Sequence, residues 1–142
     1  LRHNSQEVLF MKIQTIVLSS VIGFLTGCAG VSIPSPYTAV LSVTQDCSKS
    51  YSSYCDYSYS LTNTSPRYID PQLKVLIVDC EANTLEERII FFDTILSNKK
   101  QTKTVSHPRS EDGGTRILIL EGDSGMGYYL DGFNGSSIDF CE

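Results

Sequence analysis

The sequence predicts an all-β fold, a single antiparallel β-sandwich of about six to eight strands. Three observations predict this class. Short apolar segments with alternating or β-branched residues recur about every ten residues between positions 37 and 142. Turn-forming Pro, Gly, Asn and Ser separate these segments, and no long stretch has the periodicity of an amphipathic helix. The length of residues 28–142 suffices for one domain with its own core.

The first half of this domain contains three expected strands. Residues 37–45 and 54–63 alternate between apolar and small polar side chains, which is typical of strands with one buried face. A turn is expected at 63–66, where Asn, Thr, Ser and Pro follow one another. Residues 73–80 are almost continuously apolar and β-branched, so we expect a central strand that is buried on both faces.

The second half contains three further expected strands. Residues 81–88 are expected to form a loop or a short helical turn, and 88–96 a strand rich in Ile and Phe. The polar residues 97–100 interrupt the pattern. Residues 101–106, which alternate Thr and Val, and the apolar residues 115–121 are expected to be the next two strands.

An export signal precedes the domain at residues 11–27. Lys12 supplies one positive charge, residues 13–25 are apolar apart from small polar side chains, and Leu-Thr-Gly-Cys follows at 25–28. The apolar run is shorter than the ~20 residues that a membrane span needs. This stretch resembles the signal peptide of bacterial lipoproteins, whose lipobox ends in a cysteine. The resemblance implies that Cys28 is acylated, that the chain is cut before it, and that the lipid bilayer is a partner.

The segments on either side of the lipobox have different expected roles. Residues 1–10 precede the expected start at Met11 and fit no part of the export signal, so they are interpreted as leader or expression residues and left outside the fold. Residues 28–36 carry two prolines and two serines, which is typical of an extended tether. The sandwich domain is then expected to span 37–142.

The exported part of the chain is acidic. Without Arg2, Lys12 and Glu7, which precede the lipobox cysteine, nine Lys and Arg remain against fifteen Asp and Glu, a net charge of −6. Binding to phosphates needs concentrated positive charge. Nucleic acid is therefore not an expected partner.

Four cysteines remain in the domain when the lipobox cysteine is set aside, and an even number in an exported chain predicts two disulfides. The favoured pairing joins Cys47 to Cys55 and Cys80 to Cys141. The alternative, which joins Cys55 to Cys80 and Cys47 to Cys141, stays open. A zinc site is disfavoured because no C-x-x-C is present and His107 is the only histidine of the mature chain. We expect no metal and no other cofactor.

Part of the domain resembles the small immunoglobulin-like or fibronectin-like β-sandwich domains of bacterial envelope proteins. The matching segments are Ser60-Leu-Thr-Asn-Thr-Ser-Pro, Leu73-Lys-Val-Leu-Ile-Val-Asp, Phe91-Phe-Asp and Asn98-Lys-Lys-Gln-Thr-Lys-Thr-Val. They cover about a third of the chain and mark strands and turns rather than chemistry. The resemblance implies an immunoglobulin-like sandwich and a binding or scaffolding role, and it transfers no catalytic residue.

One motif resembles an enzyme site. Gly-Asp-Ser-Gly at 122–125 is similar to the sequence around the nucleophile of chymotrypsin-like proteases. Those enzymes need a histidine and an aspartate beside the serine, on two β-barrels. His107 is the only histidine before Ser124 in the mature chain, Pro108 follows it, and the domain is too short for two barrels. The sequence therefore favours a glycine-rich loop and no enzymatic activity.

The glycine-rich segment is the strongest candidate for a recognition surface. Tyr128, Tyr129, Asp131 and Phe133 lie among its glycines and serines. Tyrosine in Ser/Gly-rich loops provides contact area at a low cost in conformational entropy. These four residues are the candidate contacts for a protein partner. The tyrosines of the second expected strand either join such a surface or pack inside the sandwich.

Two functions are consistent with these features. The first is a non-catalytic lipoprotein that acts as a protein-binding or scaffold module in an envelope assembly of the secretion or pilus type. The alternative is a periplasmic inhibitor or immunity lipoprotein that blocks a toxin or a cell-wall hydrolase. Ala29 follows Cys28, where lipoproteins retained at the inner membrane typically carry Asp. The resemblance therefore implies anchoring in the outer membrane, with the domain facing the periplasm.

Overall fold

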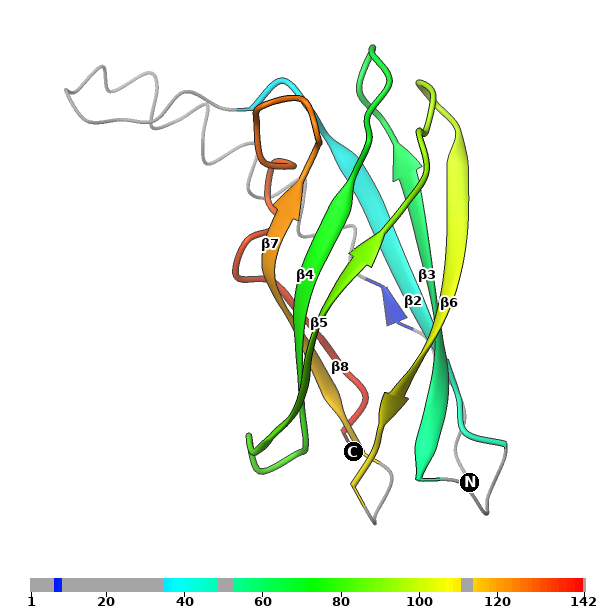
Figure 1. The fold of residues 1–142 in the computed structure, drawn as a ribbon, viewed down its shortest axis with the longest axis vertical. Helices are drawn as coiled ribbons and strands as arrows, with labels where there is room; N and C mark the ends of the chain where they lie inside the picture. Colours follow the sequence, from blue (N-terminus) through cyan, green and yellow to red (C-terminus); the bar gives the residue numbers. More distant parts are fainter. Residues whose placement is uncertain (1–6, 9–34, 49–52, 111–113, 142) are drawn as a thin grey trace, which may run out of the picture.

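The fold is a sandwich of two antiparallel β-sheets, seen in a computed structural model (Figure 1). The structure describes residues 7–8, 35–48, 53–110 and 114–141. The expected export signal and the lipidation site Cys28 lie outside these residues. Within them, no helix is long and apolar enough to cross a bilayer.

Eight strands form the two sheets of the described chain. They are β1 (Glu7–Val8), β2 (Ala39–Asp46), β3 (Tyr54–Asn63), β4 (Gln72–Val78), β5 (Thr84–Phe91), β6 (Lys100–Pro108), β7 (Arg116–Asp123) and β8 (Ser137–Asp139).

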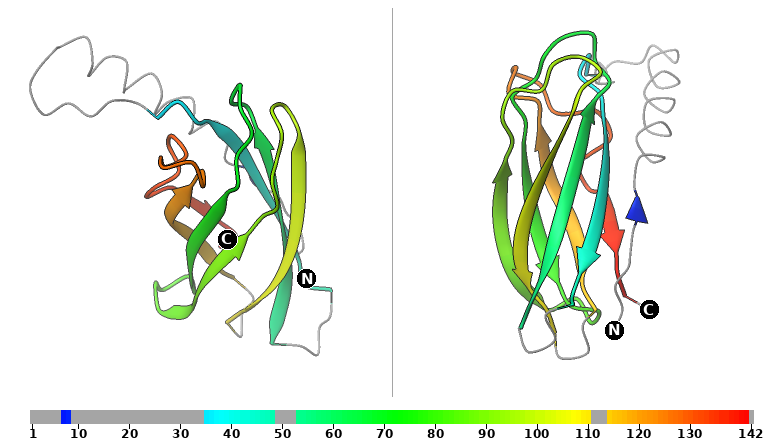
Figure 2. Two further views of the ribbon diagram at one scale, coloured as in Figure 1. Left: turned by 45° about the horizontal axis from the view of Figure 1, so that its top comes forward. Right: turned by 90° about the vertical axis from the view of Figure 1, so that its right-hand side faces the viewer.

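The first sheet has the order β1-β2-β3-β6 and the second has the order β5-β4-β7-β8. Every pair of neighbouring strands is antiparallel. The strands run along the long axis of the molecule, so that their connecting loops gather at its two ends (Figure 2). The predicted β-sandwich is confirmed, whereas its immunoglobulin-like topology stays a prediction.

The core lies between the inner faces of the two sheets and follows from the alternation along each strand. On β3, Tyr57, Tyr59 and Leu61 are fully buried, while the intervening Ser58 and Ser60 are only half-buried on the outer face. The second sheet supplies the opposing layer from its three longest strands. Its fully buried members are Leu73, Val75, Ile77, Ile90, Ile117 and Ile119.

The predicted strands are recovered with small changes in their bounds, and the segment 73–80 differs in its burial. This segment corresponds to β4, which lies between β5 and β7 and is central, as expected. Its burial alternates, with Leu73 and Val75 buried and Lys74 and Leu76 half-buried. The prediction of burial on both faces is wrong, because each sheet of this sandwich covers the core with one face only.

The boundaries of the next strand were predicted incorrectly. Residues 81–88 were expected to form a loop or turn and 88–96 a strand, whereas β5 begins at Thr84 and ends at Phe91. The charged residues Glu86, Glu87 and Arg88 therefore belong to a strand. They are tolerated because β5 is at the edge of its sheet, where charged side chains reach water and pairing with β4 outweighs strand propensity.

Two short strands were not predicted. The three-residue β8 pairs with β7 near the C-terminus. Glu7 and Val8, in the segment that the sequence analysis leaves outside the fold, form β1 and pair with Val43 and Ser42 of β2. Such short segments carry no periodicity that could identify them in advance.

Two disulfides join the predicted cysteines in the favoured pairing. Cys47 and Cys55 are linked across eight residues, and Cys80 and Cys141 across 61 residues. The second disulfide fixes the end of the chain after β8 to the end of β4. Gly114 lies against it, because a Cβ atom there would come 2.4 Å from the Sγ atom of Cys80.

The two disulfides are expected to contribute unequally to stability. In the chain-entropy model, the longer loop gives about 4 kcal/mol and the shorter one about 2.5 kcal/mol. Replacing Cys80 and Cys141 together with Ala should therefore lower the free energy of unfolding more than replacing Cys47 and Cys55 does. Urea unfolding of both double variants measures the difference, and an equal loss would contradict this expectation.

Candidate functional site

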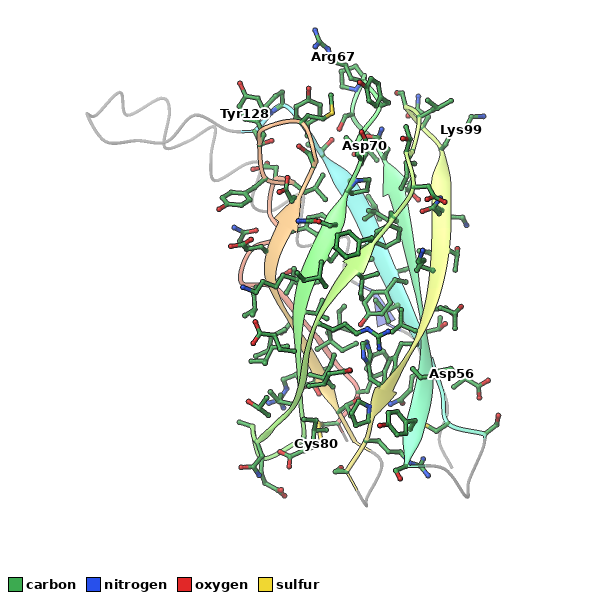
Figure 3. All side chains as sticks on the ribbon, viewed as in Figure 1. Asp56, Arg67, Asp70, Cys80, Lys99 and Tyr128 are labelled. Atoms are coloured by element: carbon green, nitrogen blue, oxygen red, sulfur yellow. A yellow bond between two sulfur atoms is a disulfide. The ribbon has the colours of Figure 1, made fainter. Side chains whose placement is uncertain are left out.

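Three loops meet at one end of the sandwich, which we call the loop end. They connect β3 to β4, β5 to β6 and β7 to β8, and they comprise residues 64–71, 92–99 and 124–136. Figure 3 labels Arg67, Asp70, Lys99 and Tyr128 near this end, whereas Cys80 lies at the other end. The predicted recognition segment is thus one of three loops at the same end of the sandwich.

Large apolar side chains are exposed on all three loops. Among the described residues, eight large hydrophobic side chains are exposed, and half of them are at the loop end. These are Tyr68 (48% exposed), Leu96 (58%), Tyr128 (52%) and Tyr129 (54%). Exposed aromatic side chains that gather from separate loops are typical of interaction surfaces rather than of a solvated surface.

The β7–β8 loop holds its two tyrosines in place through a tight turn. The backbone N–H and the hydroxyl of Ser124 both donate to the carbonyl of Tyr128, at 3.0 and 2.6 Å. Gly125 and Gly127 have φ values of +77° and +89°, which favour glycine. The ring of Tyr128 also packs against Tyr37, with the ring centroids 5.7 Å apart.

The other predicted contacts lie beneath or beside these tyrosines. Phe133 is only 1% exposed and packs into the core, where it contacts Gly122, so it supports the loop and presents no surface to a partner. Asp131 is half-buried, and its backbone N–H donates to the carbonyl of Tyr37 at 3.0 Å. Burial raises the pKa of the Asp131 carboxyl. The exposed part of the prediction is therefore Tyr128, Tyr129 and the edge of Asp131.

Asn63 joins the other two loops from below. Its side chain is fully buried, and its Nδ2 atom donates to the carbonyls of Arg67 at 2.7 Å and Ile95 at 2.9 Å. Its Oδ1 atom accepts from the N–H of Ser65 at 2.8 Å. The backbone carbonyl of Asn63 accepts a further hydrogen bond from the N–H of Asn98 at 2.7 Å. One buried amide therefore fixes both the β3–β4 loop and the β5–β6 loop.

Asp70 connects these loops to the β7–β8 loop. Its N–H donates to the carbonyl of Ser124 at 2.9 Å, and its carboxylate accepts from the hydroxyl of Thr94. Gly125 packs so closely on Asp70 that an added Cβ atom would lie 2.1 Å from the Asp70 carbonyl oxygen. The three loops are thus hydrogen-bonded into one unit, which presents the exposed side chains in a fixed arrangement.

The structure does not bring together the residues of the protease-like motif. Ser124 is fully buried and donates its hydroxyl to the carbonyl of Tyr128, so it stabilises the turn. His107 contacts Tyr59 and Glu86 instead. Neither residue has the hydrogen bond between nucleophile and base that a triad requires.

A buried hydrogen-bond network crosses the sandwich near β5 and β6, and no sequence pattern predicted it. The Nε2 atom of fully buried His107 lies 2.7 Å from the hydroxyl of Tyr59, and its Nδ1 atom lies 2.8 Å from Oε1 of Glu86. A neutral imidazole with its proton on Nδ1 donates to the carboxylate and accepts from Tyr59. The network therefore links the two sheets.

Burial determines the protonation of His107 and Tyr59 in this network. It lowers the pKa of His107, although the hydrogen bond to Glu86 acts in the opposite direction. It also raises the pKa of Tyr59, and the nearby charges of Tyr57 and Glu86 add to this effect. At neutral pH the imidazole and the phenol are both uncharged, so the arrangement is that of a structural hydrogen-bond network.

A second buried network surrounds the other core tyrosine. The hydroxyl of Tyr57 is 2.7 Å from the Nε2 atom of Gln45 and 2.5 Å from the hydroxyl of Thr115. Burial raises the pKa of Tyr57, and these hydrogen bonds partly oppose the change. Tyr57 and Tyr59 of the second expected strand therefore pack the core, whereas Tyr54 at the start of this strand is 50% exposed.

The described residues contain no group of His, Cys, Asp and Glu side chains that could hold a metal ion. Acidic and amide oxygens near the C-terminus have partners within the chain. Asp123 accepts from the N–H of Gly125, Asn134 from the N–H of Gly122, and Asp139 from Arg116. These side chains act as turn caps and surface ion pairs.

No protein-family model and no curated protein matches this sequence.

The His107 network is expected to make stability depend on pH. Because burial lowers the pKa of His107 in the folded protein, the unfolded chain binds a proton first as the pH falls below about 6.5. The contribution of His107 to the free energy of unfolding is therefore complete above about pH 6.5. It declines at lower pH, by at most about 1.4 kcal/mol per pH unit. Urea unfolding at pH 7.5 and 5.5 should show a smaller loss for His107→Gln than for the natural chain. Parallel losses in both proteins would contradict the assignment.

Proposed function

We propose that the protein is a membrane-anchored, non-catalytic lipoprotein that binds a protein partner in a bacterial envelope assembly of the secretion or pilus type. Its anchor is acylated Cys28, its address is the periplasmic side of the outer membrane, and its contact surface is the loop end. The alternative is a periplasmic inhibitor or immunity lipoprotein.

The observation that carries this proposal is the construction of the loop end. Tyr68, Leu96, Tyr128 and Tyr129 expose apolar surface from three loops that are hydrogen-bonded to one another through Asn63 and Asp70. Isolated exposed hydrophobic residues need no explanation, but a rigid group of them favours binding. Because the loops are already ordered, a partner binds them with little loss of conformational entropy.

The position of the anchor supports a partner at the membrane. The described domain begins at Ser35, and Tyr37 contacts Tyr128 of the loop end. Residues 28–34 span at most about 25 Å when fully extended. A lipid on Cys28 therefore keeps the loop end close to the bilayer, within reach of membrane-embedded proteins.

The disulfides support a location outside the cytoplasm. Cys47–Cys55 and Cys80–Cys141 need an oxidising compartment such as the periplasm. This agrees with the lipobox expected at residues 25–28.

The alternative function is favoured by one feature of the β7–β8 loop. Its turn from Ser124 to Tyr128 is tight, and it carries two adjacent exposed tyrosines. A tight turn with exposed aromatic side chains can enter the cleft of an enzyme. The two functions differ in their partners, since an assembly protein contacts several envelope proteins and an inhibitor binds a single enzyme in near-equal amount.

Affinity capture from native membranes tests the proposed function. The lipidated protein with a C-terminal tag should recover several envelope-spanning proteins, identified by mass spectrometry. The double variant Tyr128→Ala, Tyr129→Ala should recover them at least about tenfold less well, because exposed aromatic side chains dominate such interfaces. Its fold should persist, since these side chains are half-exposed and surface substitutions cost little stability.

Two controls make this experiment decisive. Tyr54→Ala removes a tyrosine that is 50% exposed at the opposite end of β3, and it should leave recovery unchanged. Cys28→Ser should release the protein from the membrane and abolish recovery. Undiminished capture by the double tyrosine variant would exclude the loop end as the contact. Recovery of a single hydrolase or toxin in near-equal amount would favour the inhibitor function instead.

A further inference from the structure

The edges of the two sheets are protected unequally. Strand edges present unpaired N–H and C=O groups that can pair with another chain, and proteins usually block them with charges, proline, bulges or very short strands. Three outer strands of this sandwich, β5, β6 and β8, carry such features. The edge of β2 has much less protection.

The strands β5 and β6 carry charged residues and shield one another. Their charged side chains are Glu86, Glu87, Arg88, Lys100 and Lys103. The guanidinium of Arg88 on β5 donates to the carbonyl of Ser106 on β6 at 3.1 Å, and Glu86 contacts His107. A bulge also interrupts the pairing of β5 with β4. The third of these outer strands, β8, has only three residues.

The edge of β2 lacks these features. Its residues from Ala39 to Gln45 include no charged residue and no proline, and its register with β3 is uninterrupted over eight residues. Within the described chain, only Glu7 and Val8 pair with this edge, opposite Val43 and Ser42. From Ala39 to Gln45, β2 is therefore a long edge strand without charged residues.

The hydrogen-bonding direction along β2 shows which groups face outward. The carbonyl of Thr38, the residue before β2, accepts from the N–H of Thr64 after β3. In an antiparallel pair, successive residues direct their N–H and C=O groups alternately to one side and the other. The odd-numbered residues Ala39, Leu41, Val43 and Gln45 therefore direct these groups away from β3. Glu7 lies opposite Val43, one of these residues.

We propose that β2 is a strand-addition site that accepts an extended segment of a partner protein, antiparallel to Ala39–Asp46. Glu7 and Val8 show the pairing in the structure, where they contact only the centre of the strand. Cleavage before Cys28, which is part of the proposed function, removes them and opens the whole edge. This surface is separate from the loop end.

The neighbours on β2 define the chemistry of the segment. Its side chains on the inner side lie beside Leu41 and Val43 and are apolar. Those on the outer side lie opposite Val40, Ser42 and Thr44 and are β-branched or hydroxylated, as on the outer face of β3. An uncharged strand of about seven residues with this alternation fits the edge.

A peptide with the sequence of residues 4–10 and the substitution Glu7→Val serves as the probe, because residues 7 and 8 pair with β2 in the structure and position 7 lies opposite Val43 on the apolar inner side. The full chain carrying Glu7→Pro and Val8→Pro is studied in detergent micelles, where these prolines remove its own competing strand. Amide hydrogen exchange is measured by nuclear magnetic resonance with and without the peptide at millimolar concentration. Protection should rise at Leu41, Val43 and Gln45.

Two serines provide a matched pair of variants. Ser42 on β2 and Ser60 on β3 lie directly opposite one another and share the outer face of the sheet. In the same Pro-substituted chain, Ser42→Lys should weaken peptide binding at least about tenfold, whereas Ser60→Lys should change it less than about twofold. Circular dichroism verifies that both variants keep their β-structure.

Three outcomes would overturn the proposal. In the first, millimolar peptide does not slow amide exchange on β2. In the second, it slows amide exchange on β5 or β6 instead. In the third, Ser42→Lys and Ser60→Lys weaken peptide binding equally. None of these outcomes bears on membrane anchoring or on capture through Tyr128 and Tyr129, so failure of the strand-addition site is distinguishable from failure of the proposed function.

Discussion

The arrangement of the loop end depends on one buried side chain, the amide of Asn63. It makes three hydrogen bonds to backbone groups of two loops, at Arg67, Ile95 and Ser65. Loop backbones carry polar groups that are costly to bury without partners, about 1–3 kcal/mol for each. A single amide at the end of β3 satisfies several of them at once. The loops can therefore pack closely while their large apolar side chains stay exposed.

The opposite part of the sandwich is held together by different means. The two outer strands β5 and β6 are joined by the hydrogen bonds from Tyr59 through His107 to Glu86. The disulfide between Cys80 and Cys141 fixes the end of the chain after β8. Buried polar networks specify one arrangement when every member has a partner. The long β2 edge has no such network, and in the described residues only the two-residue strand β1 pairs with it.

Much of this architecture could be predicted from local patterns, and the rest depends on tertiary contacts. Alternation at Tyr57, Tyr59 and Leu61 predicts β3 correctly, because one face of the strand is buried. The disulfide pairing was favoured because Cys47–Cys55 closes a short polar loop and Cys80–Cys141 ties the C-terminus to the core. The start of β5 was missed because its charged residues are stabilised by pairing at a sheet edge. Tyr128 and Tyr129 were expected at the surface, but the pattern did not distinguish buried Phe133 from them, and nothing local marks Asn63 as the residue that joins the loops.

If the loop end is rigid before any partner binds, amide hydrogen exchange of the free protein will reveal it. Loop amides with backbone or Asn63 acceptors should exchange nearly as slowly as those of the strands. These amides include those of Ser65, Ile69, Asp70, Ile95, Asn98 and Ser124. In Asn63→Ala, the amide of Ser65 should lose its protection while those of β2 and β3 keep theirs. Fast exchange of the loop amides in the natural chain, with the strands protected, would show that the loop end is not rigid in the free protein.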